Sequence, residues 1–493
     1  MTGTPADRDI AALARGGRTN FYGFLLRLVA RIPFLFIAGR LYGAAALGRF
    51  ASAMVVVELA GQLCTLGQKR GLALRLAGEE RREANIIADG VVLSSMLAII
   101  MAAALLIYPW PMFPSAIFTP YDRLLPLAIL PATITDISLA ALAYRFDIGA
   151  TVRARSVVEP WVLSILAGVF YFIQRDSGLS LAYIGSILAS TVVALVPLFK
   201  SYGVPRGWRP HPLRLARLAL STMPLAVADA VEWGTRKLDI AILGLFATPT
   251  SVGVYYVAQQ VASLPQKLKT SFEPILGPVI TRNLKDKNYP AIAYQVRQVG
   301  FWIIAAQAGI ALALGIPGMS VLGLVGPDFI HGDLALQFLL AAEVCAATAV
   351  VSEAALIYIT PFRNLAVSLI TITLQAVLTL IGMVVASTYD FNRFDWASSA
   401  AGALMVTLAI GSLIKSQLLA HYLRESVNSW RLVLLKAALP AMAYGWVVSV
   451  YMPAWAELAF GTFGILGIYC GFMWFFGFTP ADRVLFRSKA DAG

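Results

Sequence analysis

Apolar runs long enough to cross a lipid bilayer recur along the whole 493-residue chain. A membrane-spanning helix needs about 20 residues that are mostly apolar. Because backbone groups in lipid must be hydrogen-bonded within the protein, runs of this kind predict helices. The chain is only 13% charged, whereas soluble domains carry about 25% charged residues. The sequence therefore predicts an all-α polytopic membrane protein.

Fourteen runs satisfy the length rule, so we predict about 14 transmembrane helices. The predicted spans are Asn20–Leu41, Phe50–Leu66, Asn85–Tyr108, Leu124–Tyr144, Val157–Ile173, Leu179–Phe199, Leu218–Leu245, Val252–Leu276, Val299–Ile316, Leu334–Ile359, Leu365–Ser387, Ser398–Ala420, Leu432–Met452 and Leu458–Phe478.

The distribution of lysine and arginine predicts the orientation of these spans. Most of the 39 basic residues fall in alternate connecting segments, beginning with the N-terminal one, and few fall in the others. Cytoplasmic loops of membrane proteins are enriched in Lys and Arg. We therefore predict that both termini are cytoplasmic, which requires an even number of spans. The same bias explains the net charge of +12, and we expect no nucleic-acid partner.

An internal repeat divides the chain. The connection at residues 200–217 contains three prolines, so it cannot be a continuous helix. A shift of 205 residues places segment 47–53 over segment 252–258, and Arg31 over Arg236. This pattern predicts two pseudo-symmetric six-helix lobes, the arrangement of transporters whose halves rock about a central site. The expected regions are an N-lobe at 1–213, a C-lobe at 214–425 and two extra C-terminal spans at 426–493.

Basic residues inside the predicted spans are candidates for an anion site. They are Arg27 and Arg31 in the first span, Arg236 in the seventh and Lys267 in the eighth. A charge at the bilayer centre costs roughly 2.5–3.5 kcal/mol on insertion scales, and such residues usually mark a pathway or binding site. The planar fork of arginine suits phosphate. Two alternatives remain open: an arginine could pair with an acid such as Asp229, and Lys267 could reach the membrane interface.

Acidic residues inside the spans are candidates for coupling to H⁺ or Na⁺, namely Asp136, Asp229 and Glu232. For Glu159, Glu343 and Glu353 we favour a structural role. The three cysteines and three histidines show no metal-ligand spacing, and we expect no cofactor. The chain has no phosphate-binding loop and no hydrolase or metalloprotease motif, which argues against an enzyme.

The N-terminal sequence resembles that of bacterial polysaccharide flippases of the multidrug/oligosaccharidyl-lipid/polysaccharide (MOP) exporter superfamily. The residues that carry the resemblance are Asn20-Phe21, Arg27, Arg31, Arg40-Leu41-Tyr42-Gly43 and Leu47-Gly48-Arg49-Phe50. The resemblance covers about sixty residues. It implies that Arg27, Arg31, Arg236 and Lys267 line a basic cavity. The acid-rich seventh span has no counterpart in the family pattern.

The resemblance implies an inner-membrane flippase that moves an undecaprenyl-pyrophosphate-linked saccharide to the periplasmic leaflet by alternating access. Its expected partners are the lipid-linked saccharide, membrane lipids, and a polymerase or glycosyltransferases of the same pathway. The first alternative is a cation-coupled multidrug exporter of the same superfamily, against which the basic first span argues. The second is a membrane scaffold for polysaccharide synthesis that does not itself transport. A membrane-embedded glycosyltransferase is the third, but no carboxylate pair in a loop indicates one.

Overall fold

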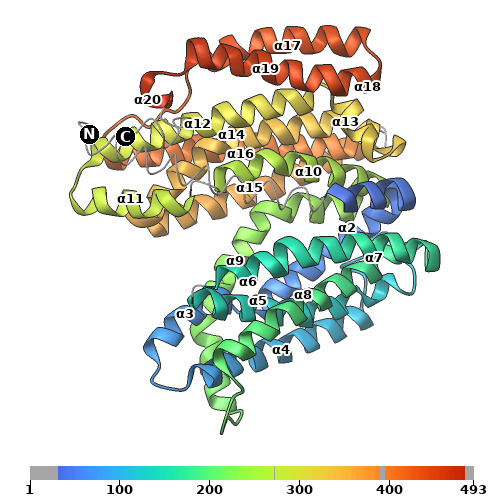
Figure 1. Ribbon diagram of the computed structural model, residues 1–493, viewed down its shortest axis with the longest axis vertical. Helices are drawn as coiled ribbons and strands as arrows, with labels where there is room; N and C mark the ends of the chain where they lie inside the picture. Colours follow the sequence, from blue (N-terminus) through green and yellow to red (C-terminus); the bar gives the residue numbers. More distant parts are fainter. Residues whose placement is uncertain (1–31, 146, 271–272, 389–394, 484–493) are drawn as a thin grey trace. The chain divides into compact units, whose positions relative to one another are not determined.

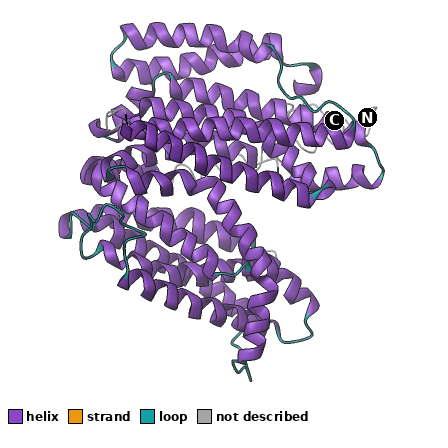
Figure 2. Ribbon diagram, turned by 180° about the vertical axis from the view of Figure 1, so that it is seen from behind, coloured by secondary structure: helices purple, strands orange, loops and turns teal. Residues whose placement is uncertain are grey.

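The fold is taken from a computed structural model of the chain. It describes residues 32–145, 147–270, 273–388 and 395–483, without the side chains at 148, 232, 266–270, 273–278, 395, 480 and 481. Every regular element in the described part is a helix (Figure 2), which confirms the all-α class. The chain forms two compact units, an N-terminal unit within Leu26–Gly253 and a C-terminal unit from Val254 onward. The predicted lobe boundary at residue 213 stays a prediction.

The N-terminal unit contains eleven of the labelled helical elements of the described part. They are η1 (Ala38–Tyr42), α2 (Gly43–Cys64), α3 (Gln68–Gly78), α4 (Glu83–Ile107), η2 (Asp122–Ala128), α5 (Ile129–Tyr144), α6 (Ile148–Thr151), η3 (Val152–Val158), α7 (Glu159–Ile173), α8 (Gly178–Tyr202) and α9 (Pro212–Phe246). The gap between α8 and α9 confirms that the proline-containing connection at 200–217 interrupts the helix.

The chain reverses direction at Gly43. This residue has φ +82°, a conformation that costs glycine little because it has no Cβ. The rings of Phe34 and Phe50 lie 6.1 Å apart, although sixteen residues of continuous helix would separate them by about 24 Å. The helices on either side of Gly43 therefore form an antiparallel pair, joined with almost no loop.

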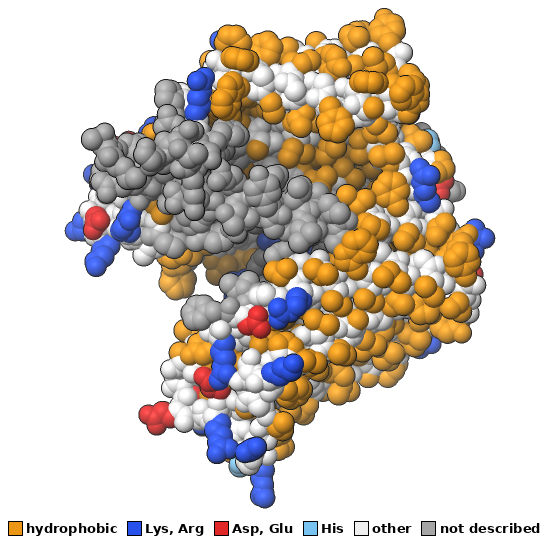
Figure 3. Space-filling view, viewed as in Figure 1, with side chains coloured by type: hydrophobic (Ala, Val, Ile, Leu, Met, Phe, Trp, Pro, Cys, Tyr) orange, Lys and Arg blue, Asp and Glu red, His pale blue; other side chains and the backbone are white. Residues whose placement is uncertain are grey.

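Helices of the N-terminal unit pack around a core that is apolar in the middle and charged at one end. In Figure 1, α4, α5 and α8 lie side by side, and α7 packs on α8. Leu72, Ile86, Ile137 and Leu142 are buried between them. Hydrophobic side chains cover much of the face in Figure 3, whereas charged side chains gather at the lower left, towards the end that carries α3.

The C-terminal unit begins inside α10. Its elements are α10 (Pro249–Thr270), α11 (Glu273–Lys285), α12 (Tyr289–Gly315), α13 (Gly318–Val325), η4 (Pro327–Gly332), α14 (Asp333–Ile359), α15 (Pro361–Thr388), α16 (Asp395–Leu423), α17 (Val433–Tyr451), α18 (Ala454–Ala456), η5 (Glu457–Gly461), α19 (Thr462–Phe472), η6 (Met473–Gly477) and α20 (Pro480–Arg483).

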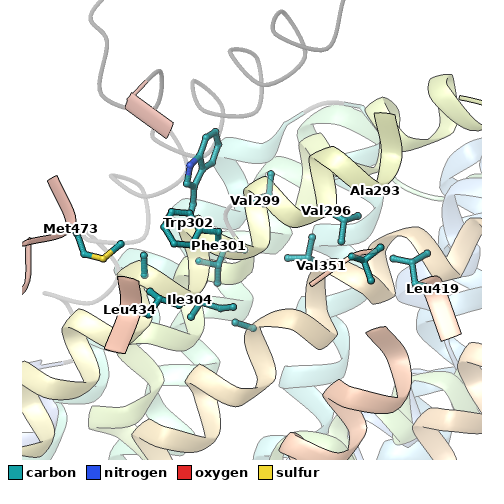
Figure 4. Packing of buried hydrophobic residues seen from close by; sticks show 14 of the residues in the cluster. Ala293, Val296, Val299, Phe301, Trp302, Ile304, Val351, Leu419, Leu434 and Met473 are labelled. Atoms are coloured by element: carbon teal, nitrogen blue, oxygen red, sulfur yellow. The ribbon is translucent and has the colours of Figure 1, made fainter. Parts of the chain in front are cut away.

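The central helix of the C-terminal unit is α12, which is buried along most of its length. Phe301, Trp302 and Ile304 of α12 share one core with Val351 of α14 (Figure 4). Residues of α17 and α19 belong to the same core. The last two long helices therefore pack against each other and against α12.

Eleven segments of the described part are long and apolar enough to cross a membrane. One of them, Ile32–Gly78, contains the reversal at Gly43 and corresponds to the first two predicted spans. The helices α9 and α10 correspond to the predicted seventh and eighth spans, but neither is among the eleven. The count of fourteen therefore stays a prediction. The connection at 317–333 between α12 and α14 is largely helical, since it contains α13 and η4.

Candidate functional site

Four of the seven predicted site residues have side chains outside the described part. Arg27 and Arg31 precede the first described residue. Glu232 and Lys267 lie on α9 and α10, but their side chains are not described. The remaining three are Arg236 and Asp229 on α9 and Asp136 on α5, and their surroundings can be stated.

Asp229 lies against the short helix α3. Its Oδ1 is 2.7 Å from Nε of Arg70, and its side chain is only 7% exposed. Its Oδ2 is buried and receives no hydrogen bond from the described residues. Arg236 lies two turns further along α9 with an exposed side chain. The basic partner of Asp229 is therefore Arg70, which the charge pattern of the sequence places in a cytoplasmic connecting segment.

Asp136 lies at the centre of a four-residue ion cluster. Nζ of Lys69 is 2.6 Å from its Oδ2, and Arg155 donates to its Oδ1. Arg155 also binds Glu159, with Nη1 to Oε2 at 2.7 Å. Two acids and two bases balance, so the cluster has no net charge. This contact of Glu159 agrees with the structural role favoured from the sequence.

A π-helical turn places Arg155 in this cluster. Arg155 lies in η3, a π-helix between α6 and α7. A π-turn widens the helix by one residue and is frequent at functional sites. Sequence reasoning missed this contribution because Arg155 falls between two apolar runs, and the widened turn has no sequence signal that spacing alone reveals.

Asp89 accepts hydrogen bonds from two side chains and forms an ion pair with a third, at the end of the unit that carries α3. It is fully buried on α4. Its Oδ2 is 2.7 Å from Nη1 of Arg81 and 3.1 Å from Nε of Arg214. Nε1 of Trp208 donates to Oδ1 at 2.8 Å. Asp89 therefore ties α4 to the connection that leads into α9. Sequence reasoning missed it, although an acid inside the third predicted span was a usable signal.

Arg49 lies in the sequence that carries the family resemblance. Its Nε is 3.6 Å from Oδ2 of Asp122, and its Nη2 donates to the carbonyl of Asp176 at 3.1 Å. Ser180 also donates to Asp122. Arg49 therefore joins the start of α2 to η2 and to the loop before α8. These contacts give it a structural role.

Two glycines related by the 205-residue shift contact each other. A Cβ on Gly48 would lie 2.8 Å from N of Gly253, and a Cβ on Gly253 would lie 3.0 Å from N of Gly48. Carbonyl oxygens of Pro249 and Ala44 would be closer still. The backbones at the start of α2 and the start of α10 therefore touch.

An ion pair joins long helices of the C-terminal unit. Nζ of Lys415 on α16 is 2.9 Å from Oε2 of Glu353 on α14, and donates to Oγ of Ser368 on α15 at 3.1 Å. The Lys415 side chain is 9% exposed. The pair joins three helices, which agrees with the structural role favoured for Glu353.

A second polar centre joins the end of the chain to α12. The Asp482 carboxylate accepts from Nη1 of Arg431 at 2.9 Å and from Nε1 of Trp302 at 3.1 Å. Gln298 and Thr479 are further donors. Burial alone would raise the pKa of Asp482, but the bonds from Thr479 and Arg431 lower it below its usual value. The carboxylate is thereby held ionised.

No group of three or more His, Cys, Asp or Glu side chains that could hold a metal ion occurs in the described part of the chain. The clusters above are ion pairs between acids and bases. A bound cation would compete there with a lysine or arginine already in place. Within the described residues, Oδ2 of Asp229 is a buried carboxylate oxygen that receives no hydrogen bond.

The arrangement of helices is similar to that of several solved membrane transporters. It is similar to lipid II flippase MurJ in an inward closed conformation, with TM-score 0.68 and 13% identity over 92% of this chain and 97% of that chain. It is also similar to a multidrug resistance MATE family transporter in an inward-facing conformation, with TM-score 0.57 and 16% identity over 86% and 97%. A MOP superfamily transporter from Pyrococcus furiosus Vc1 gives TM-score 0.55 and 14% identity over 86% and 99%. The fold is that of the MOP exporter superfamily.

The family follows from the sequence. The family model described as polysaccharide biosynthesis protein matches residues 36–312, which is more than half of the chain. The chain therefore belongs to this family. Among proteins with curated annotation, none matches it in sequence.

Proposed function

We propose that the protein is a flippase that moves an undecaprenyl-pyrophosphate-linked saccharide from the cytoplasmic to the periplasmic leaflet of the bacterial inner membrane. The observation that carries this proposal is the match to the polysaccharide biosynthesis family on a MOP exporter fold. Transport proceeds by alternating access of two six-helix lobes. Both termini lie in the cytoplasm, and the transported product supplies a polymerase or glycosyltransferase of surface polysaccharide synthesis.

Four basic residues bind the pyrophosphate in this proposal, namely Arg27, Arg31, Arg236 and Lys267. Arginine offers parallel donors that match two phosphate oxygens. Arg236 lies on α9 with an exposed side chain. The saccharide occupies the watery part of the pathway, where hydroxyl groups keep their hydrogen bonds to water.

Coupling to H⁺ or Na⁺ is assigned to Asp136, Asp229 and Glu232. The buried Oδ2 of Asp229 receives no hydrogen bond, which favours Asp229 for this role. Both oxygens of Asp136 already have partners, which favours Asp136 less. Outward transport of the substrate does not require coupling to an ion. An inside-negative potential favours outward movement of an anion by about 2.3 kcal/mol per charge per 100 mV. No other cofactor is part of the proposal.

The test is polysaccharide export by a deletion strain that carries the wild type, Arg31→Ala or Arg31→Lys, with membrane protein levels measured in parallel. We expect Ala to abolish export and Lys to restore part of it, because Lys keeps the charge but not the fork. Full export by Arg31→Ala at normal protein level would remove Arg31 from the substrate path. That result would also favour a scaffold, which tolerates neutral replacement.

A second candidate function is a cation-coupled multidrug exporter, which the similarity to MATE transporters favours. Such a protein needs a cavity that accepts cationic compounds, so acids should dominate it. The same strains distinguish the two functions. A multidrug exporter gives a change in resistance to cationic dyes and leaves surface polysaccharide unchanged, whereas a flippase gives the opposite result.

A further inference from the structure

The connection at residues 200–217, between the end of α8 and the start of α9, is basic and contains no acid. Its five basic residues are Lys200, Arg206, Arg209, Arg214 and Arg217, and we call this segment the basic connection. It forms the lower tip of the N-terminal unit in Figure 1, and Lys and Arg side chains gather around that tip in Figure 3. The enrichment of cytoplasmic loops in basic residues accounts for their number, but not for their arrangement in the folded chain.

Hydrogen bonds hold the backbone of the basic connection against α4. Trp208 and Arg214 both reach the buried aspartate of α4 with their side chains. Nη2 of Arg214 also donates to the carbonyl oxygen of Arg209 at 2.9 Å, and Nδ2 of Asn85 on α4 donates to the carbonyl oxygen of Arg206 at 3.3 Å. Arg206 and Arg209 are therefore fixed through their backbone, which leaves their guanidinium groups available.

Three arginines of the basic connection point charge into solvent. The side chains of Arg206, Arg209 and Arg217 are exposed, and none of them forms an ion pair with an acid of the described part of the chain. The neighbouring connection between α3 and α4 exposes both Arg82 and Glu80, so these two charges cancel. Three positive charges therefore lie on this surface without a counterion from the described residues, and the surface is complementary to an anionic partner.

The first turns of α9 add an exposed apolar face to this basic surface. Leu213, Arg217 and Leu220 lie along one face of the helix, because they are four and three residues apart. Leu213 is 85% exposed and Leu220 is 72% exposed. The opposite face buries Leu215 and Leu218 against α4. Leucines beside arginines on an exposed helix face are typical of a segment that lies at a membrane interface.

We propose that the basic connection binds the headgroups of anionic phospholipids, with Arg206, Arg209 and Arg217 at the phosphates and with Leu213 and Leu220 against the adjoining acyl chains. Basic segments next to a membrane-spanning helix attract anionic lipids, and the planar fork of arginine matches phosphate oxygens. Because the backbone is already held against α4, binding requires little further ordering. Lipid binding at this surface does not depend on which substrate the protein transports.

The test is native mass spectrometry of the full-length protein in detergent, titrated with phosphatidylglycerol or with the zwitterionic phosphatidylcholine. The variants are Arg206→Gln with Arg209→Gln and, to keep the charge, Arg206→Lys with Arg209→Lys. The control is Arg123→Gln with Arg175→Gln, which removes the same charge at the other end of the unit. Arg123 is exposed and donates to a carbonyl at the end of α4, and Arg175 is exposed before α8. Thermal melting checks that each variant is folded.

We expect the wild type to bind phosphatidylglycerol at least tenfold more tightly than phosphatidylcholine. Each base near an anionic surface strengthens binding about fivefold, so the double Gln variant should lose at least tenfold in affinity for phosphatidylglycerol. The double Lys variant should stay within about threefold of the wild type, because it keeps both charges. The control should bind as the wild type does. Phosphatidylglycerol should also slow hydrogen exchange at residues 203–217 of the wild type.

Three results would overturn the proposal. The first is wild-type affinity for phosphatidylglycerol in the folded double Gln variant, or an equal loss in the control. The second is equal binding of the two phospholipids by the wild type. The third comes from a parallel titration with undecaprenyl pyrophosphate: if this ligand displaces phosphatidylglycerol and loses tenfold in affinity in the double Gln variant, the basic connection binds a transported pyrophosphate and not a membrane phospholipid.

Discussion

Gly48 and Gly253 allow two helices to come into backbone contact, because neither residue has a side chain. Each would place a Cβ against the backbone of the other segment. Overpacking of a core usually costs about 1–3 kcal/mol, and here the obstacle is backbone, which cannot rotate away. We expect Gly48→Ala to lower the melting temperature of the purified protein by several degrees, measured by fluorescence-detected size exclusion after heating.

Gly61→Ala is the matched control for that experiment. Gly61 lies on the same helix α2, and a Cβ there would have no atom within 4 Å. Alanine favours a helix over glycine by about 1 kcal/mol, so we expect an unchanged or raised melting temperature. Equal destabilisation by both substitutions would show that the contact with Gly253 is not the cause.

Asp482 predicts a dependence of stability on acid pH. Its pKa is lowered in the folded protein, so its contribution is fully present above the unfolded value of about 3.9 and is lost as pH falls through the folded value. We expect the melting temperature of the wild type to fall more steeply below about pH 4 than that of Asp482→Asn. At pH 7, Asp482→Asn should be less stable by about 3 kcal/mol, the usual cost of breaking a buried pair.

Melting curves between pH 7 and pH 3 measure both effects. Asp328→Asn serves as the control, because Asp328 is exposed before α14 and the substitution should leave the curve unchanged. A parallel pH dependence in the wild type and Asp482→Asn would contradict the assignment.

At the scale of elements, Asp89 determines how the connection at 203–211 enters α9. Asp89→Asn keeps the shape of the side chain but removes the charge that Arg81 and Arg214 share. We expect faster hydrogen exchange at residues 203–217, measured by mass spectrometry, because the start of α9 loses its anchor. The control is Asp147→Asn, whose ion pair with Arg153 is exposed and should contribute little. Unchanged exchange in Asp89→Asn would mean that packing alone holds the connection.

Substitutions of Lys415 and Glu353 should have non-additive effects on the stability of the protein. Lys415→Met alone leaves the Glu353 carboxylate without its base between α14 and α16. Because that carboxylate is 36% exposed, the loss of stability should be smaller than the roughly 3–5 kcal/mol of a fully buried pair. Replacing both residues by apolar ones of similar size, Lys415→Met with Glu353→Leu, should recover most of that loss. Thermal melting of the two single variants and the double variant completes the cycle. Additive losses would show that the two side chains act independently.

Sequence patterns predicted the elements better than the contacts between their side chains. Apolar length placed the long helices, and the prolines near Pro210 ended α8 before α9. The length of apolar runs did not predict α13 and η4 within residues 317–333, because both helices are short and lie between turn residues. It could not find the partner of Asp136, since Lys69 and Arg155 lie outside the apolar runs and reach the acid only after folding.

For the whole molecule, the last two long helices contribute to the core of the C-terminal unit. The sequence predicts them as an addition to a twelve-helix arrangement, which stays a prediction. Leu434 and Tyr469 share a core with Phe301 and Trp302 of α12. We expect truncation after Glu425 to expose this core and to lower the yield of monodisperse protein several-fold, measured by size exclusion of a fluorescent fusion. Full yield from the truncated chain would show that residues 254–425 fold without these helices.

The candidate site illustrates the same limit for the whole chain. Basic residues inside the predicted spans are the sequence signal for an anion site, which stays a prediction. The sequence did not show that Arg70 pairs with Asp229, because a base that follows an apolar run is indistinguishable from any cytoplasmic base until α3 is folded against α9. The contacts of a charged side chain, such as those of Asp229, exist only in the folded chain and are not visible in the sequence.

The mutual contact of Gly48 and Gly253 also bears on ancestry. If one six-helix gene was duplicated to give this chain, the two positions were once the same codon in two copies of a dimer. A single mutation there would have placed two Cβ atoms in one contact, so the ancestral gene had little freedom to change it. After fusion each codon could drift separately, yet each still faces the other's backbone. The contact between Gly48 and Gly253 should therefore be among the last traces of such a duplication to disappear.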